Sequence, residues 1–339
     1  MSSNKIRHIV FTGAWTIAVA TFSSPLALAT AAVPIVNTGG FESFNLTNLA
    51  GQQGWITDSF PPIRPGSAVV QSGVVRSGAK ALQIDRAANS DKSWAIDVTN
   101  FNIHRIVVVD WDMRVTATGL ETGPIGPFFG VESHDLNANP GFTLLGSLGV
   151  DATTGEVLYQ AEGSGALVAS SSEVVFGAWH HYRLLYDFTL HKYSGFFEGT
   201  KVVTTGFVDQ VLGGGLNDFT ITGFSALAAQ PDSGSQALTG TVYVDNFRVW
   251  DGIPEDFNVD LAVSGLDFSS WKAAFGSGSG ADADGDLDSD GVDFLAWQRE
   301  TGFTLPTSTA VSAAVPEPAG ALLLALAAWG LQGRRRCLA

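Results

Sequence analysis

The stretch that decides the fold is Val107-Val108-Val109-Asp110-Trp111-Asp112-Met113-Arg114-Val115-Thr116. Its odd-numbered residues are all apolar, whereas most of the residues between them are polar. A second run alternates in the same way, with Tyr182, Leu184, Tyr186 and Phe188 set against His181, Arg183, Leu185 and Asp187. This period of two predicts antiparallel strands that pack on one face and meet water on the other.

Similar runs, separated by Gly, Asn, Asp and Ser, continue on both sides of this stretch. We expect strands at Ser67–Gln71, Lys80–Arg86, Ser93–Val98, Arg105–Ala117, Phe128–Glu132, Leu144–Val150, Val157–Glu162, Trp179–Phe188, Lys192–Glu198, Lys201–Gly206, Phe219–Ser225 and Thr241–Trp250. No long amphipathic helix is evident among them. About a dozen strands over residues 35–251 predict a mainly β domain, a two-sheet jelly-roll sandwich.

Two acidic stretches with the same twelve-residue spacing follow the predicted sandwich. Oxygen side chains at positions 1, 3, 5, 9 and 12, with a backbone carbonyl at position 7, are the ligands that a short loop offers to Ca²⁺. The first set is Asp256, Asn258, Asp260, Ala262, Ser264 and Asp267. The second set is Asp282, Asp284, Asp286, Asp288, Asp290 and Asp293. The alternative is an acidic linker that binds no metal.

A helix-compatible segment follows each loop, at Phe268–Phe275 and at Phe294–Thr301. This doubled unit, over residues 255–303, resembles the type I dockerin repeat and the dockerin-like segments of planctomycete secreted proteins. The resemblance implies two Ca²⁺-loaded loop–helix units and a cohesin-like or other docking partner. Leu261 and Leu287 occupy position 6, where glycine is usual, and a left-handed leucine costs on the order of 1 kcal/mol. We expect the second loop, with more carboxylates, to bind more tightly.

Four short motifs of the predicted sandwich are similar to concanavalin A-like and laminin-G-like domains and to jelly-roll carbohydrate-binding modules. They are Gly39-Gly40-Phe41-Glu42, Val75-Arg76-Ser77-Gly78, Gly177-Ala178-Trp179-His180-His181-Tyr182 and Tyr243-Val244-Asp245-Asn246-Phe247. The resemblance implies a structural Ca²⁺ shared by Glu42 and Asp245. Independently, Asp245 alternates with Tyr243 and Phe247, which we expect to face the core, and an inward carboxylate needs a partner. A hydrogen-bonded cap of the strand ends is the alternative.

A sugar site needs an exposed aromatic platform with polar neighbours. The candidate platform residues are Trp55, Trp94, Phe128 and Phe129, beside Asp110, Asp112 and Arg114. Core packing is the alternative for each aromatic residue, and Trp111 and Trp179 fit the core or its rim.

Support for catalysis in the sequence is slight. The nearest acidic cluster is Glu132 with Asp135, which we expect in a loop. His180 and His181 would face opposite sides of a strand. We therefore expect no catalytic residues.

The chain ends carry targeting signals. Lys5 and Arg7 precede an apolar run and small-x-small sites that end at Ala29 and Ala31, which predicts a secretory signal peptide over residues 1–31. An uncleaved membrane anchor is the alternative.

After a linker at 304–314, residues 315–339 contain Pro316-Glu317-Pro318, an apolar run and Arg334-Arg335-Arg336. This tail resembles a PEP-CTERM sorting signal, which implies a short hydrophobic membrane helix and processing by an exosortase. A permanent tail anchor is the alternative.

Composition narrows the function. The net charge is -15, and the single cysteine, Cys337, lies in the tail, so we expect no nucleic-acid partner and no disulfide. The membrane would be met only through the tail. The sequence favours a secreted or cell-surface, non-catalytic protein that binds polysaccharide through the sandwich. A structural matrix protein without a glycan site and a divergent polysaccharide hydrolase remain the alternatives.

Overall fold

A computed structural model describes residues 32–57, 64–98, 106–119, 125–136, 143–209, 219–227 and 233–305. The predicted signal peptide lies outside these residues, as does nearly all of the linker and tail. In the described part of the chain, no helix is long and apolar enough to span a membrane.

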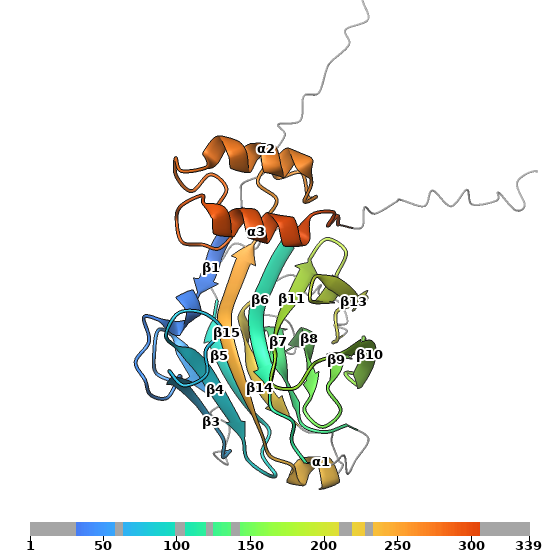
Figure 1. The fold of residues 1–339 in the computed structure, drawn as a ribbon. Coiled ribbons are helices and arrows are strands. Elements are labelled where there is room, and N and C mark those ends of the chain that lie inside the picture. The colour runs from blue at the N-terminus through green and yellow to red at the C-terminus, as the bar shows by residue number, and fades with distance from the viewer. Residues whose placement is uncertain are drawn as a thin grey trace, which may run out of the picture.

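Two antiparallel sheets form the body of the molecule, which confirms the predicted sandwich (Figure 1). The first sheet has the order β13 (Thr200–Gly206), β12 (Lys192–Phe197), β11 (Trp179–Asp187), β6 (Ile106–Val115), β15 (Gly240–Asp251), β4 (Ala81–Arg86) and β3 (Ser67–Gln71), and β1 (Val33–Asn37) also pairs with β15. The second has the order β10 (Leu167–Glu173), β9 (Glu156–Gln160), β8 (Thr143–Asp151), β7 (Phe128–Asp135), β14 (Ile221–Leu227), β5 (Lys92–Asp97) and β2 (Trp55–Thr57).

The main core lies between the sheets and follows the alternation of the sequence. Val107, Val109, Trp111, Met113 and Val115 of β6 point into it. Tyr182, Leu184 and Tyr186 of β11 enter it from the neighbouring strand, and the rings of Trp111 and Tyr182 stack with their centroids 5.5 Å apart. Burial of these aromatic and β-branched side chains is the main force that holds the sheets together.

The predicted faces fail in two places. The outer face of β6 and β11, which we expected to meet water, is buried by residues 253–305, and Val108, Arg183 and Leu185 on it are at most 3% exposed. The second failure is in the last strand. The register of β15 against β6 shifts between Asp245 and Arg248, and Asn246 has a φ of 52°. This bulge inserts one extra residue, so Val242 and Val244 face the core before it and Phe247 and Val249 after it. The expectation that Tyr243 faces the core was therefore wrong, because its ring lies 5.8 Å from the guanidinium of Arg114.

Three strands were not predicted: β1, β2 and β10. Helices are few; η1 (Gly39–Phe41) and α1 (Ser233–Ala237) are single turns. The two longer helices, α2 (Gly265–Ala274) and α3 (Gly291–Glu300), follow the acidic stretches, and each begins with a capping box. We call residues 255–305 the loop–helix repeat.

The loop–helix repeat packs against one end of the first sheet, where α3 lies across the ends of the strands and α2 packs on the far side of α3 (Figure 1). A second apolar cluster joins the two parts, and we call it the junction core. It contains Ile106, Val108, Leu185, Phe196, Trp250, Ile253, Val263 and Leu305, with Ala32, Leu261, Trp297 and Phe303 at its edge. The rings of Phe196 and Phe303 meet edge to face at 5.6 Å. The repeat is thus part of the folded body.

Candidate functional site

The first acidic loop folds around its own carboxylates. Asp256 accepts hydrogen bonds from the backbone N–H groups of Asp260, at 2.9 Å, and Leu261, at 2.6 Å. Asp267, from the first turn of α2, accepts from the N–H groups of Asn258 and Ser264 at 3.1 and 2.7 Å. These bonds bring the oxygens of Asp256, Asp260 and Asp267 within 4.8 Å of one another.

The second loop repeats this arrangement. Asp282 accepts from the N–H groups of Asp286 and Leu287, and Asp293 accepts from those of Asp284 and Asp290. The oxygens of Asp282, Asp284 and Asp293 lie within 4.8 Å of one another, and those of Asp288, Asp290 and Asp293 form a second such group. Leu261 and Leu287 have φ values of 68° and 77°, so position 6 of each loop takes the left-handed conformation expected for it.

The chemistry of these groups fits a hard divalent cation. Every side-chain donor is an oxygen, which Ca²⁺ and Mg²⁺ prefer. Asp267 and Asp293 are fully buried, and such closely grouped carboxylates repel each other unless a cation lies between them. Burial raises the pKa of Asp256 to about 6 and that of Asp284 to about 6, so the charged form of both carboxyl groups is destabilised. Ala262 and Asp288 occupy the position that supplies a carbonyl ligand.

The two loops are tied to each other through the helices. The indole N–H of Trp271 donates to the carbonyl of Asp290 in the second loop, and that of Trp297 donates to the carbonyl of Ser264 in the first, both at 2.8 Å. The rings of Phe268 and Trp297 stack at 5.0 Å between the helices. Because the tryptophans cross over reciprocally, a change in one loop reaches the other directly.

Glu42 and Asp245 converge on one loop of the sandwich. Asp245 is fully buried and accepts from the N–H groups of Arg76 and Ser77 at 3.0 and 3.2 Å. Glu42 accepts from the N–H groups of Ala79 and Lys80 at 2.7 and 3.0 Å. These bonds match the hydrogen-bonded alternative, and a Ca²⁺ shared by the two carboxylates stays a prediction. Burial raises the pKa of Asp245 to about 6.

A buried arginine joins the loop–helix repeat to the sandwich. Arg183 of β11 donates from Nε and Nη2 to the carboxylate of Asp110 at 2.6 and 3.1 Å. It also donates to both oxygens of Glu255, at 2.7 and 3.2 Å, and its Nη1 lies 3.3 Å from Glu300 of α3. All four side chains are buried. One guanidinium therefore holds three carboxylates from three parts of the chain.

His181 continues this polar layer across the outer face of the first sheet. It pairs in register with Asp112, and its Nδ1 lies 3.2 Å from the carboxylate of Asp112. Asn246 donates to the other oxygen of Asp112 at 2.8 Å. Burial alone would lower the pKa of His181, but its contacts with Asp110 and Asp112 raise it above the usual value. Burial disfavours the anion of Asp110, yet Arg183 and His181 lower the pKa of that carboxyl.

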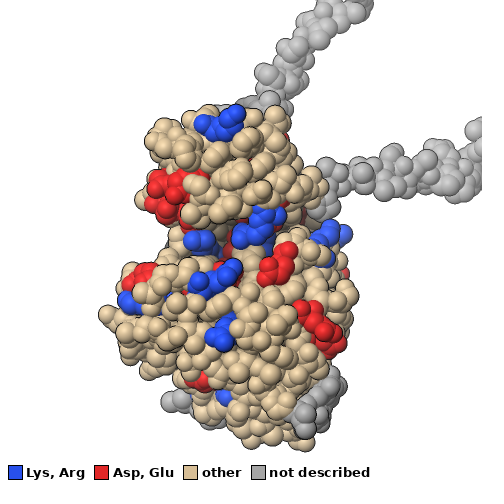
Figure 2. All heavy atoms as spheres, in the orientation of Figure 1, with Lys and Arg blue, Asp and Glu red and all other residues tan. Residues whose placement is uncertain are grey.

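A cleft of about 400 Å³ opens between this polar layer and the loop–helix repeat, and we call it the junction cleft. Its floor is polar and comes from β6, β11 and β15. Its opposite wall comes from α3 and is largely apolar. The lining residues that matter for its chemistry are Asp110, Asp112, His181, Asn246, Arg248, Arg299, Val292 and Leu295. Lys and Arg side chains gather along this waist of the molecule (Figure 2).

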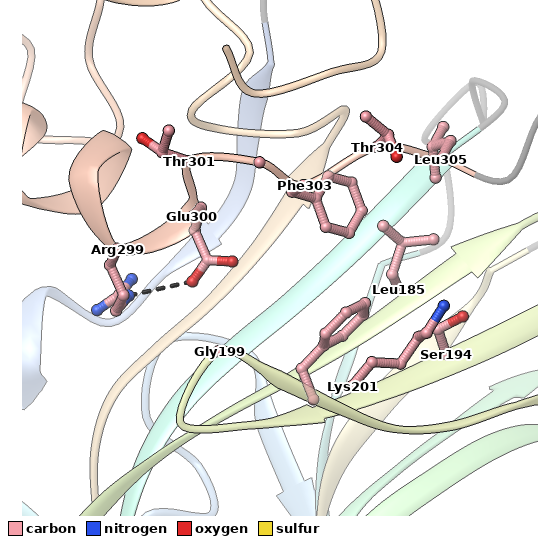
Figure 3. A pocket seen from close by; sticks show the side chains of 12 residues that line it. Leu185, Ser194, Gly199, Lys201, Arg299, Glu300, Thr301, Phe303, Thr304 and Leu305 are labelled. Carbon is pink, nitrogen blue, oxygen red and sulfur yellow. Dashed lines mark hydrogen bonds and ion pairs between the residues drawn. The ribbon is translucent and has the colours of Figure 1, made fainter.

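A second hollow, of about 380 Å³, lies at the carboxyl end of α3. Phe303 and Leu185 lie near each other in it, and Glu300 turns toward Arg299, whose Nε lies 3.1 Å away (Figure 3). Lys201 and Ser194 contribute polar atoms from β13 and β12. This hollow is the open side of the junction core rather than a separate group of functional side chains.

The expected aromatic platform does not form. Trp55, Trp94, Phe128 and Phe129 are all at most 3% exposed, so the alternative of core packing is correct for them. Trp111 is likewise in the core. Asp110 and Asp112 do lie on the outer face of their strand, but the repeat and their ion pairs bury them. Arg114 donates to the carbonyl of Gly177.

The two carboxylates considered for catalysis lie on opposite sides of β7. Glu132 accepts a hydrogen bond from the hydroxyl of Ser225, whereas Asp135 is fully buried at the end of the strand. The expectation of a loop at Asp135 was wrong. His180 and His181 diverge as predicted, His180 toward Glu198 and His181 toward Asp112. Sequence reasoning missed the cluster of Arg183, Glu255 and Glu300, because Glu255 and Glu300 have polar neighbours in the sequence and nothing there links them to Arg183.

No protein-family model matches this chain, and no curated protein matches it significantly. Among solved structures, a sialidase aligns at 13% identity over 66% of this chain and 19% of its own, with a TM-score of 0.39. An endo-β-1,4-glucuronan lyase from the fungus Trichoderma reesei aligns at 15% identity over 61% of this chain and 95% of its own, with a TM-score of 0.43.

A variant of an alginate lyase in complex with an alginate trisaccharide aligns at 13% identity, over 65% of this chain and 98% of its own, with a TM-score of 0.41. The chain thus spans about a fifth of the sialidase and nearly the whole of the two lyases. At identities and TM-scores this low, none of these similarities assigns a function to the chain.

Proposed function

We propose that this chain is a secreted, non-catalytic protein that binds polysaccharide in the junction cleft, with Ca²⁺ stabilising the loop–helix repeat that forms one wall. The observation that carries the proposal is the amphipathic cleft itself. Its floor offers the amide of Asn246 and the guanidinium of Arg248 to the oxygens of a sugar, whereas Val292 and Leu295 offer an aliphatic surface to the apolar face of its ring. We therefore assign sugar recognition to this cleft and not to the aromatic residues expected from the sequence.

Calcium binding would affect the cleft because the second acidic loop forms part of its wall. Asp284 lines the cleft and belongs to the second acidic loop, and Arg299 reaches the cleft from α3, which that loop precedes. A bound Ca²⁺ would neutralise the carboxylates and hold α3 in place. Secretion, tail processing by an exosortase and attachment to the cell surface remain expectations from the chain ends.

The test is binding of Ala32–Val315, the expected processed chain, to a panel of neutral and acidic polysaccharides, first with Ca²⁺ and then with EDTA. Saturable binding of one glycan class that is lost in EDTA supports the proposal. A folded protein that binds none of the panel under either condition contradicts it and leaves a matrix role. Substituting Asn246→Ala at the floor, with Asn45→Ala as a distant control, assigns any binding to the cleft.

A second candidate function is a divergent polysaccharide-degrading enzyme. The specific observation is that His181 lies within 3.6 Å of the carboxylates of both Asp110 and Asp112, which puts acid and base groups in one cleft. Incubation of each bound polysaccharide with the protein, followed by assay of new reducing ends, tests this. Reducing ends that vanish in a His181→Gln variant would establish the enzyme.

We also propose that the chain docks onto another protein through α2. Leu266 of α2 is 63% exposed, and Val292, its counterpart on α3, is 50% exposed but lines the junction cleft. A docking partner that leaves the cleft open to a saccharide would therefore meet α2. Comparing capture of a cohesin domain by the chain and by a Leu266→Asp variant checks this directly.

A further inference from the structure

The carboxylates on the floor of the junction cleft already have partners, and Asp284 at its other side belongs to the second acidic loop, where it accepts from the N–H of Asp286 and is an expected Ca²⁺ ligand. Arg183 holds Asp110, Glu255 and Glu300, and Asp112 is held by His181 and Asn246. The carboxylates on the floor are therefore compensated, and little of their capacity to bind a further cation remains.

The basic groups of the same cleft are in the opposite condition. Arg248 lies in register with Asp110, yet among the described residues its guanidinium makes no hydrogen bond or ion pair within the usual limits, its Nε is buried, and its charge acts on Asp284 only at longer range. Arg76, beside the cleft rather than in its lining, reaches only to 3.9 Å from Asp112, and Arg299 lies 3.1 Å from Glu300 with 43% of its side chain exposed. A guanidinium has five donors and no acceptor, so the unused capacity of the cleft is that of a positively charged donor.

The positions of the arginines also favour a negatively charged ligand. Arg248 and Arg299 line the junction cleft from its two sides, β15 and α3, so that both can approach one bound group. The rest of the protein is acidic, with a net charge of -15, but charges farther away than about 10 Å are screened at ordinary ionic strength. The local guanidinium groups then decide the sign of the ligand.

We infer that the junction cleft takes an acidic saccharide, with Arg248 as the main partner of its oxyanion and Val292 and Leu295 against its ring. This inference rests on the proposed function, because it names the class of polysaccharide that the cleft would bind. A planar guanidinium matches the two oxygens of a carboxylate, and a sulfate ester presents the same chemistry. Arg76 and Arg299 supply further positive charge at the rim.

The test compares short oligosaccharides, which do not gel with Ca²⁺, by calorimetry in the presence of Ca²⁺. The probes are oligogalacturonate, its fully methyl-esterified form, a sulfated galactan oligosaccharide and a neutral cello-oligosaccharide. Arg248→Gln removes the charge from the cleft, and Lys192→Gln, at an exposed position on β12, is the matched control. Arg76→Gln serves as a second variant on a half-exposed side chain if Arg248→Gln does not fold.

Binding of oligogalacturonate but not of its ester, weakened about tenfold or more by Arg248→Gln and unchanged by Lys192→Gln, supports the inference with a carboxylate as the source. Binding of the sulfated probe alone, with the same response to the variants, supports it with a sulfate. Equal binding of neutral and acidic probes, unaffected by Arg248→Gln and Arg76→Gln, overturns the inference and leaves the proposed function standing. Binding of no probe overturns both.

Discussion

Replacing the buried Arg183 by methionine tests how the loop–helix repeat is held. The substitution keeps the aliphatic volume but leaves Asp110, Glu255 and Glu300, all at most 6% exposed, without their shared cation. Removing one partner of a buried ion pair costs about 3–5 kcal/mol. At about 2–4 °C per kcal/mol for a body of this size, the melting temperature should fall by roughly 6–20 °C.

The reciprocal substitution should be far milder. Burial raises the pKa of Glu255, against the opposing effect of Arg183, so the charge of this carboxyl is poorly stabilised in the folded protein. Glu255→Gln leaves Arg183 with Asp110 and Glu300 and keeps an oxygen that accepts a hydrogen bond. We expect it to cost about 1 kcal/mol or less.

Chemical denaturation followed by tryptophan fluorescence measures both variants, with Lys192→Met as an exposed control. Limited proteolysis at residues 252–254 reports separately whether the repeat has come away from the sandwich. Arg183→Met within about 1 kcal/mol of the parent protein, or Glu255→Gln as damaging as Arg183→Met, would refute the reasoning that one cation compensates three buried carboxylates.

Three further outcomes follow from the acidic loops and from the polar layer around His181. Calcium at a hundred times its Kd should stabilise the chain by about 2.7 kcal/mol per site, and calorimetry should find two sites, reduced to one by Asp267→Asn or Asp293→Asn; unchanged stoichiometry would contradict the assignment. In EDTA, the raised carboxyl pKa values of about 6 at Asp256 and Asp284 mean that, as the pH falls, the folded state takes up protons before the unfolded state does, so stability should fall as pH rises from about 4 to 7; denaturation at three pH values checks this, and a rise in stability would contradict the burial of these two carboxyl groups. Because the pKa of His181 is raised in the folded protein, the protonated imidazole stabilises the fold below the unfolded pKa of about 6.5, and this stability is lost as pH rises through the folded pKa. NMR titration should give a pKa above about 6.5 for His181, and a value below about 6.5 would contradict its ion pairs with Asp110 and Asp112.

The core could be predicted because alternation within a strand is a local property. The alternating positions of Val107, Val109 and Trp111 predict that they share one face of a strand, and the structure places them in the core. Alternation fails where a bulge resets it, and nothing in the sequence around Asp245 marks the inserted residue. Tyr243 was assigned to the wrong face for that reason, although Asp245 proved to be buried.

The acidic loops could be found from spacing, whereas their place in the fold could not. Ligand spacing involves residues close in the chain, but the junction core joins residues of β6, β11 and the repeat that are far apart in sequence. A faint signal existed, since Val108 and Leu185 are apolar residues on otherwise polar faces. Val108 pairs with Leu185, and Arg183 pairs with Asp110 two residues along; only this long-range pairing of β6 with β11 reveals the contact.

The position of the two ends of the described body has a mechanical consequence. Ala32 and Leu305 both belong to the junction core, so the chain enters and leaves the body at one end, far from α1 (Figure 1). A pulling force applied through both ends would not be carried through the length of the sandwich. It would open the contacts at that end and peel β1 from β15 one hydrogen bond at a time, so the body should yield at low force there while the sheets beyond stay folded.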